Sequence, residues 1–143
     1  AVGGHPCRVA RVRVADVLDR DAGRFGDGDD WGTDPDDAAT ICEGNSQLTV
    51  HHNAHLDAFL AVHVDGMTDD LVLRTAPAPE GPWSAQEFAF TAEPAQGDGF
   101  VYCGLGHEEL AGDGGRLEYV SYYRGTGDWT GEIRLVEVEI DGL

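Results

Sequence analysis

The chain has 143 residues, of which 41% are apolar, and this is enough to build the hydrophobic core of one folded domain. It carries 27 acidic residues against 9 basic ones, all of them arginine, and the formal net charge of −18 argues against a nucleic-acid partner, which would need clustered cations. No apolar run reaches the roughly 18 residues of a membrane-spanning helix, so we expect no membrane span.

Alternation of apolar and polar residues, the period of a half-buried β-strand, dominates the chain. The first alternation covers residues 11–14, and a segment rich in glycine and aspartate follows at 26–37. In the last expected strand the apolar face switches after Leu135, which predicts a β-bulge. The sequence between the acidic segment and the end of the chain predicts strands at residues 47–52, 58–64, 71–74, 87–91, 99–103, 117–123 and 132–140.

No segment has a convincing helical period, so we expect an all-β fold built of antiparallel sheets. Strands at roughly ten-residue spacing are typical of a sandwich, a barrel or a β-propeller. Residues 47–91 hold enough strands for one full propeller blade and residues 99–143 for a last blade, while 1–46 would end a preceding blade and add the acidic loop. About two blades of a β-propeller cannot close a ring, so we expect them to pair with the remainder of the propeller or to self-associate.

The three cysteines, Cys7, Cys42 and Cys103, lack the C-x-x-C spacing of a zinc site. They suit one disulfide bond with one thiol left over, or three buried thiols, and all three pairings remain open. Because the basic residues are all arginine and aspartate is abundant, we expect a secreted or extracytoplasmic protein.

The acidic segment 27–37 packs six carboxylates into eleven residues. A hard cation such as Ca²⁺ would relieve their mutual repulsion, which makes Asp27, Asp29 and Asp30 candidate calcium ligands. The segment is not an EF-hand loop, since Trp31 stands where a ligand should be. A solvated acidic loop without an ion is the alternative.

Histidines stand at the ends of the two strands that we expect to be innermost in adjacent blades. His51 and His52 end the strand at 47–52, and His107 follows the strand that begins at 99. Imidazole binds metals and hydrogen-bonds to hydroxyl groups, so His52 and His107 are candidate ligand-binding residues facing a shared channel. Glu108 is a candidate catalytic acid there, although Glu108 and Glu109 point to opposite faces and form no catalytic pair by themselves. Histidines satisfied by the protein alone are the alternative.

A distinctive turn carries a family resemblance. Residues 74–84 read RTAPAPEGPWS and resemble the strand and turn R-x-A-x-x-P-E-G-P-W-S of secreted five-bladed β-propellers related to glycoside hydrolases. Residues 45–59 resemble a hairpin of that family, and residues 102–109 are similar to its Y-x-G-x-x-H-P-E segment, with Glu108 in place of proline. The family includes microbial endo-D-arabinanases, and related propellers hydrolyse arabinans and xylans.

The resemblance implies a glycoside-hydrolase-like propeller directed at a polysaccharide or oligosaccharide, such as an arabinan, with catalytic acids in blades outside this segment. It places His107 where related enzymes have a histidine that contacts an axial metal ion. Arg74 and Trp83 are candidate ligand-binding residues in the distinctive strand and turn, with a structural ion pair and a purely structural turn as their alternatives. A non-catalytic glycan-binding or surface module is the alternative function, supported by Trp31, Trp83 and Trp129 if these are exposed.

Overall fold

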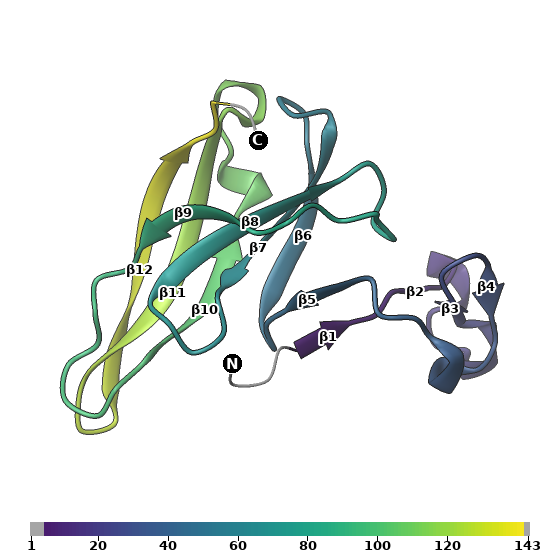
Figure 1. Ribbon diagram of the computed structural model, residues 1–143, viewed down its shortest axis with the longest axis horizontal. Helices are drawn as coiled ribbons and strands as arrows, with labels where there is room; N and C mark the ends of the chain where they lie inside the picture. Colours follow the sequence, from purple (N-terminus) through teal and green to yellow (C-terminus); the bar gives the residue numbers. More distant parts are fainter. Residues whose placement is uncertain (1–4, 142–143) are drawn as a thin grey trace.

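The computed structural model describes residues 5–141, which form twelve strands in four separate antiparallel sheets (Figure 1). Within this range the only helices are short 3-10 turns at Val14–Asp16, Arg20–Ala22, Pro35–Asp37, Glu108–Leu110 and Asp113–Gly115. The expected all-β class is therefore confirmed, including one four-stranded antiparallel sheet. No helix of the described residues is long and apolar enough to cross a membrane.

The four-stranded sheet has the strands in chain order. It consists of β6 (Leu48–Asn53), β7 (Ala58–Val64), β8 (Asp70–Ala76) and β9 (Glu87–Thr91). The strands β7 and β9 begin and end where the sequence predicts them. The central strand β7 is buried on both faces from Leu60 onward, which explains why its sequence is apolar without alternation.

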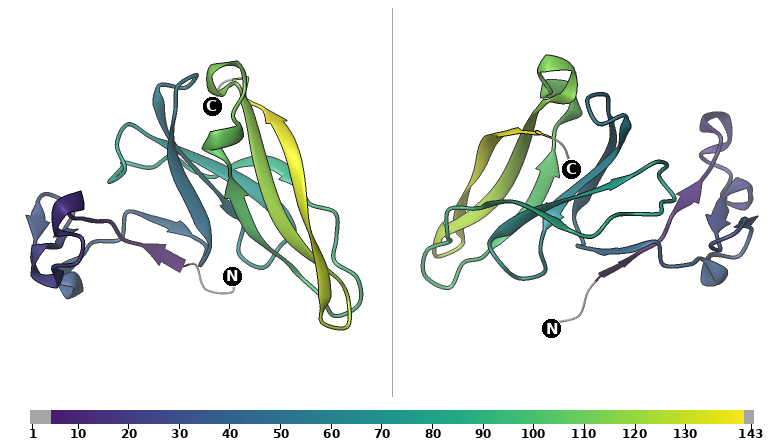
Figure 2. Two further views of the ribbon diagram at one scale, coloured as in Figure 1. Left: turned by 180° about the vertical axis from the view of Figure 1, so that it is seen from behind. Right: turned by 45° about the horizontal axis from the view of Figure 1, so that its top comes forward.

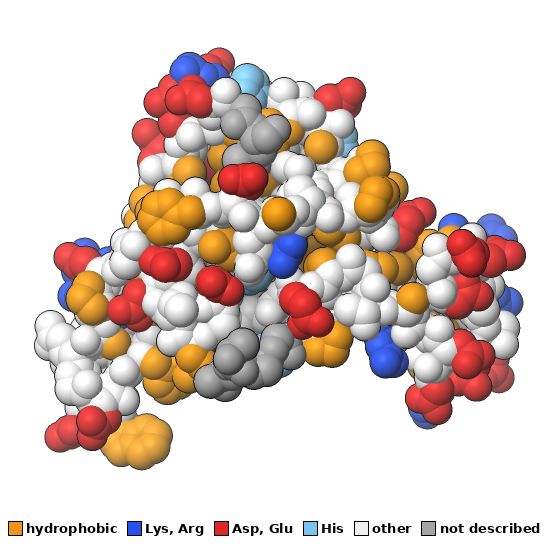
Figure 3. All heavy atoms as spheres, in the orientation of Figure 1, with side chains coloured by type: hydrophobic (Ala, Val, Ile, Leu, Met, Phe, Trp, Pro, Cys, Tyr) orange, Lys and Arg blue, Asp and Glu red, His pale blue; other side chains and the backbone are white. Residues whose placement is uncertain are grey.

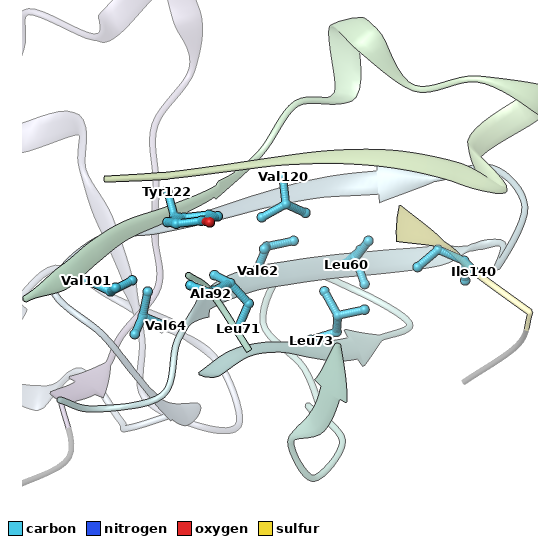
Figure 4. Packing of buried hydrophobic residues seen from close by; sticks show 10 residues of the cluster. All are labelled: Leu60, Val62, Val64, Leu71, Leu73, Ala92, Val101, Val120, Tyr122 and Ile140. Carbon is cyan, nitrogen blue, oxygen red and sulfur yellow. The ribbon is translucent and has the colours of Figure 1, made fainter. Parts of the chain in front are cut away.

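A three-stranded sheet covers one face of the four-stranded sheet. It consists of β10 (Val101–Gly106), β11 (Leu117–Gly127) and β12 (Thr130–Glu139), and β10 packs against β6 and β7. Burying one apolar side chain here contributes about 1.5–3 kcal/mol. The core between the two sheets is formed by Leu60, Val62, Val64, Leu71, Leu73, Ala92, Val101, Val120, Tyr122 and Ile140 (Figure 4).

Residues 8–41, which we call the N-terminal lobe, stand apart from the two packed sheets (Figure 2). The lobe contains a small sheet of β2 (Ala10–Arg11), β3 (Arg24–Gly26) and β4 (Trp31–Gly32). Its two ends continue into β1 (His5–Cys7) and β5 (Cys42–Gly44), which pair with each other as a two-stranded sheet. This short pair of strands joins the lobe to the rest of the protein.

Two local predictions are wrong. The strand expected at residues 11–14 ends at Arg11, and Val14 starts a 3-10 turn with 91% of its surface exposed, because no apolar face lies nearby to bury it. The bulge expected after Leu135 is absent, since β12 pairs regularly with β11 there and the irregularity lies between Gly125 and Gly127. The apolar switch arises because Leu135 lies on the exposed face of the sheet while Val136 packs against the core.

Candidate functional site

A cleft of about 390 Å³ lies between the N-terminal lobe and the turn that joins β8 to β9. The lobe contributes Asp29, Asp30 and Trp31, and the turn contributes the segment Glu80–Pro82. The structure thus brings together the acidic segment and the distinctive turn, which lie about fifty residues apart in the sequence and which sequence reasoning treated as separate features.

The lobe wall of the cleft is held by its own carboxylates. Asp27 Oδ1 accepts hydrogen bonds from the backbone N–H groups of Asp29 (3.0 Å) and Asp30 (2.7 Å), and these bonds lower the pKa of Asp27. Asp30 Oδ1 accepts a bond from the N–H of Trp31 at 2.8 Å. The guanidinium of Arg11 lies 4.0 Å from the centre of the Trp31 ring, so the half-buried indole is fixed from one side.

The carboxylates of the acidic segment are not arranged as a cation-binding site. In residues 5–141 no three His, Cys, Asp or Glu side chains are grouped so that they could hold a metal ion. One oxygen of Asp27 and one of Asp30 are already bound to the backbone, so these carboxylates act as turn-forming groups. Calcium binding by Asp27, Asp29 and Asp30 stays a prediction that the donor arrangement does not support.

The opposite wall is a turn folded back on itself. Arg74 Nη1 donates to the carbonyl oxygen of Ser84 at 2.6 Å, and Trp83 Nε1 donates to the carbonyl oxygen of Pro79 at 3.2 Å. Gly81 has a φ of +100°, and a Cβ there would lie 3.0 Å from the backbone nitrogen of Trp83. Trp83 therefore packs on its own turn. Arg74 holds the turn by a backbone hydrogen bond, and among the described residues it makes no ion pair.

A second polar cluster is buried between the two packed sheets. Glu118 on β11 is only 1% exposed; its Oε1 accepts a hydrogen bond from Asn53 Nδ2 at 2.6 Å and lies 3.2 Å from His51 Nε2. Asn53 Nδ2 also donates to the carbonyl oxygen of Gly115 at 2.7 Å. The bond to Glu118 is the main cause that raises the pKa of His51, whereas burial opposes it. Glu118 Oε2 has no hydrogen-bond partner in the described structure.

Sequence reasoning did not predict Glu118 or Asn53 as part of a cluster. A usable signal was present, because residues two apart in a strand share a face and Glu118 therefore lies on the same face as Val120 and Tyr122. All three are buried. A carboxylate on an apolar strand face predicts a buried acid that needs hydrogen-bond donors nearby.

The histidines predicted to share a channel have different partners and do not form one cluster. His52 alternates with buried His51 and occupies the other face of β6, where it lies 3.8 Å from Asp57 Oδ1 and against the edge of Phe59. His107 lies beyond the end of β10. His107 pairs with Ser121, and His51 pairs with Glu118. Ser121 and Glu118 point to opposite faces of β11, so the two histidines contact different faces of the three-stranded sheet.

Both ring nitrogens of His107 are engaged by the protein. Nδ1 lies 2.9 Å from Glu109 Oε1 and Nε2 lies 2.7 Å from Ser121 Oγ, and the bond to His107 lowers the pKa of Glu109. This arrangement favours the alternative in which the histidine is satisfied without a ligand, and metal binding at His107 stays a prediction. Glu108 is exposed beside it, at the start of a 3-10 turn.

The three tryptophans differ in exposure. Only Trp129, in the turn between β11 and β12, is fully exposed, whereas Trp31 and Trp83 are half-buried. The expectation of three exposed tryptophans is therefore wrong for two of them, because Trp83 packs on its own turn and Trp31 lies against Arg11. Trp31 nevertheless lines the cleft.

Comparison with known proteins places the chain in a family. Residues 3–121 match a family that is described as a domain of unknown function (DUF4185). No curated protein matches the chain. Since the match covers well over half of the 143 residues, the protein belongs to the DUF4185 family.

Proposed function

We propose that this chain is a glycan-directed module and that the cleft between the N-terminal lobe and the β8–β9 turn holds part of a polysaccharide or oligosaccharide. The observation that carries the proposal is the lining of the cleft, in which Trp31 lies among Asp29, Asp30 and Glu80. A volume of about 390 Å³ is within the range of small-ligand sites and suits one or two sugar rings.

The chemistry of this lining matches a neutral sugar. Sugar hydroxyls donate hydrogen bonds, and carboxylate oxygens accept them without a donor of their own. The C–H faces of a sugar ring are apolar and pack on an indole such as that of Trp31. Acidic side chains and arginines both lie over the N-terminal lobe (Figure 3), but the charged residues that line the cleft are all acidic, so the cleft repels uronates, sulfated glycans and phosphates. A neutral glycan, such as an arabinan or a xylan, fits this charge best.

We propose that the two packed sheets are consecutive blades of a propeller. The four-stranded sheet β6–β9 and the sheet β10–β12 pack face to face through one apolar core, as consecutive blades do. On the outer face of the second sheet, Ile133 and Leu135 are 76% and 53% exposed. We propose that this face packs against the remainder of a five-bladed propeller or against a second copy of the chain.

We propose that the residues of this chain bind the glycan and do not cleave it. A glycosidase needs two reachable carboxyl groups, separated by about 5–10 Å across the scissile bond. Glu118 is enclosed in the core, whereas Asp29, Asp30 and Glu80 line the cleft, where Asp30 already accepts a backbone hydrogen bond. We propose that this chain holds the glycan in a glycoside-hydrolase-like, extracytoplasmic protein whose catalytic acids lie outside the described residues.

Binding to purified glycans tests the proposal. The purified chain is titrated with arabinan, arabinogalactan and xylan by calorimetry, and reducing sugars are measured in parallel. Trp31→Ala and Glu80→Gln should each weaken binding at least about tenfold, a loss of about 1.4 kcal/mol. Trp129→Ala is the matched control, because it removes an exposed tryptophan that does not line the cleft.

The outcomes separate the alternatives. Binding without sugar release supports the binding module, and sugar release that persists in Glu80→Gln would place hydrolysis elsewhere in the chain. Glu80→Gln is nearly isosteric, so it remains informative if loss of the Trp31 ring unfolds the lobe. Equal affinity of the wild type and both cleft variants for every glycan would refute the cleft as the binding site.

A further inference from the structure

Two of the three cysteines lie directly opposite each other. Cys7 ends β1 and Cys42 begins β5, and the two residues are paired in the antiparallel ladder together with Pro6 and Glu43. Opposite residues in such a ladder have Cα atoms about 4.5–5.5 Å apart. This spacing lies within the roughly 4.4–6.8 Å at which disulfide bonds form without movement of the backbone.

Both cysteines are free thiols in the structure, and the Cys7 sulfur lies over the neighbouring strand β5. A Cβ on Gly44 would lie 2.7 Å from Cys7 Sγ, so the absence of a side chain on Gly44 makes room for the sulfur to lie across β5. Both cysteines are half-buried, which leaves them within reach of a small oxidant. Cys103 lies on β10 in the packed sheets, outside the two-stranded sheet that pairs Cys7 with Cys42.

We propose that Cys7 and Cys42 form a disulfide bond in an oxidising compartment, which fastens together the two ends of the N-terminal lobe. The lobe is the whole segment between them, residues 8–41, and it carries the Trp31 wall of the cleft. The pairing of β1 with β5 is only three residues long, so a covalent bond there holds the lobe much more firmly than the hydrogen bonds do.

A small-molecule disulfide such as glutathione disulfide can supply the oxidation. The Cys7 thiolate attacks one sulfur of glutathione disulfide and expels a glutathione thiolate, and the Cys42 thiolate then attacks the Cys7 sulfur and expels the second. Two protein thiols lose their protons and two electrons, and one glutathione disulfide becomes two glutathione molecules. Burial and the neighbouring Cys7 raise the pKa of Cys42 to about 11, with Glu43 acting in the same direction and Arg74 against it. The fraction of Cys42 thiolate, and with it the rate of the second attack, therefore rises with pH above neutrality.

Peptide mapping tests the pairing. The Cys103→Ser variant is equilibrated with a glutathione redox buffer, quenched with acid, alkylated, and digested without reduction. The expected result is one cross-linked peptide pair containing Cys7 and Cys42, a loss of two hydrogen atoms from the protein mass, and the loss of both alkylation sites. Reduction should restore the two sites. The variant Cys42→Ser/Cys103→Ser is the matched control and should form no internal cross-link.

A second measurement reports on the lobe. Oxidation should slow proteolysis within residues 8–41 in Cys103→Ser and leave it unchanged in the double variant. The proposal is overturned if both cysteines of the folded protein remain alkylated at every glutathione ratio, or if Cys103 is the partner cross-linked in the wild type. Mapping the wild type in the same way gives the answer if the serine variants do not fold.

Discussion

Replacing Glu118 by glutamine isolates the effect of the buried charge. The amide oxygen can take the place of Oε1, which accepts from Asn53 at 2.6 Å and lies 3.2 Å from His51 Nε2. The side chain keeps its shape, so no cavity forms. What changes is that two hydrogen bonds to a charged acceptor become two bonds to a neutral one.

The expected loss of stability is about 2 kcal/mol at pH 6. Hydrogen bonds to charged groups contribute about 1.5–3 kcal/mol each, and neutral ones about 0.5–1.5 kcal/mol. Two bonds thus lose roughly 2–3 kcal/mol, and the lower desolvation of a neutral amide at the unpartnered Oε2 position offsets part of this. For a chain of this size, 2 kcal/mol lowers the melting temperature by about 7 °C.

The loss should depend on pH through His51. The pKa of His51 is raised in the folded protein by Glu118, so protonation favours folding. This stabilisation is fully present below the unfolded pKa of about 6.5 and is lost as the pH rises through the higher folded value. The slope is at most about 1.4 kcal/mol per pH unit for one proton. In Glu118→Gln the main cause of the shift is gone, so this decline should flatten.

Urea unfolding followed by tryptophan fluorescence between pH 5.5 and 9 measures both effects. Glu87→Gln is the control, because it removes the same charge from an exposed position on β9. If the free energies of unfolding of Glu118→Gln and the wild type differ by a constant amount across this range, the pairing of His51 with Glu118 is not what sets the pH dependence.

Three further results are expected from the core and from the lobe. Gly104→Ala should lose about 1–3 kcal/mol or more by urea unfolding, because its Cβ would lie 2.5 Å from Leu71 Cδ1 and 2.9 Å from the backbone of Val64. Leu60→Ala should lose about 2–5 kcal/mol by the same measurement, since this side chain is fully buried, and a smaller loss would mean that the sheets repack around it. Closing a disulfide bond between the ends of the lobe should stabilise the chain by about 4 kcal/mol by restricting the unfolded state, measured as the difference between oxidised and reduced Cys103→Ser.

The strands were predictable where burial is uniform. The apolar run 58–64 is buried from Leu60 onward, and the observed strand has the predicted bounds. The alternation at residues 11–14 has the same local pattern as a strand, but its valines find no neighbouring sheet to cover them. The alternation of apolar and polar residues is therefore not sufficient for a strand. A second apolar surface must also be present to cover its apolar face.

The candidate cleft was not predictable, because it depends on how two distant segments approach each other. The sequence shows an acidic segment and a turn with Trp83, and it suggests a ligand for each of them. In the structure Trp83 packs on its own turn, and Glu80 from that turn lines the same cleft as Trp31 from the lobe. Exposure of an aromatic ring is set by loop geometry at a scale of single hydrogen bonds, which sequence patterns do not encode.

The two walls of the cleft are anchored very differently, and this connects glycan binding to the state of the cysteines. The turn wall is held to β8 by the Arg74 hydrogen bond, and β8 is an inner strand of the four-stranded sheet. The lobe wall is joined through the three paired residues of β1 and β5. A glycan that contacts both walls favours one position of the lobe. A disulfide bond between Cys7 and Cys42 favours the same position. By thermodynamic linkage each must then strengthen the other, so oxidation should raise glycan affinity and bound glycan should make the disulfide harder to reduce. If oxidation leaves the glycan affinity unchanged and bound glycan leaves the reduction of the disulfide unchanged, other contacts already fix the lobe.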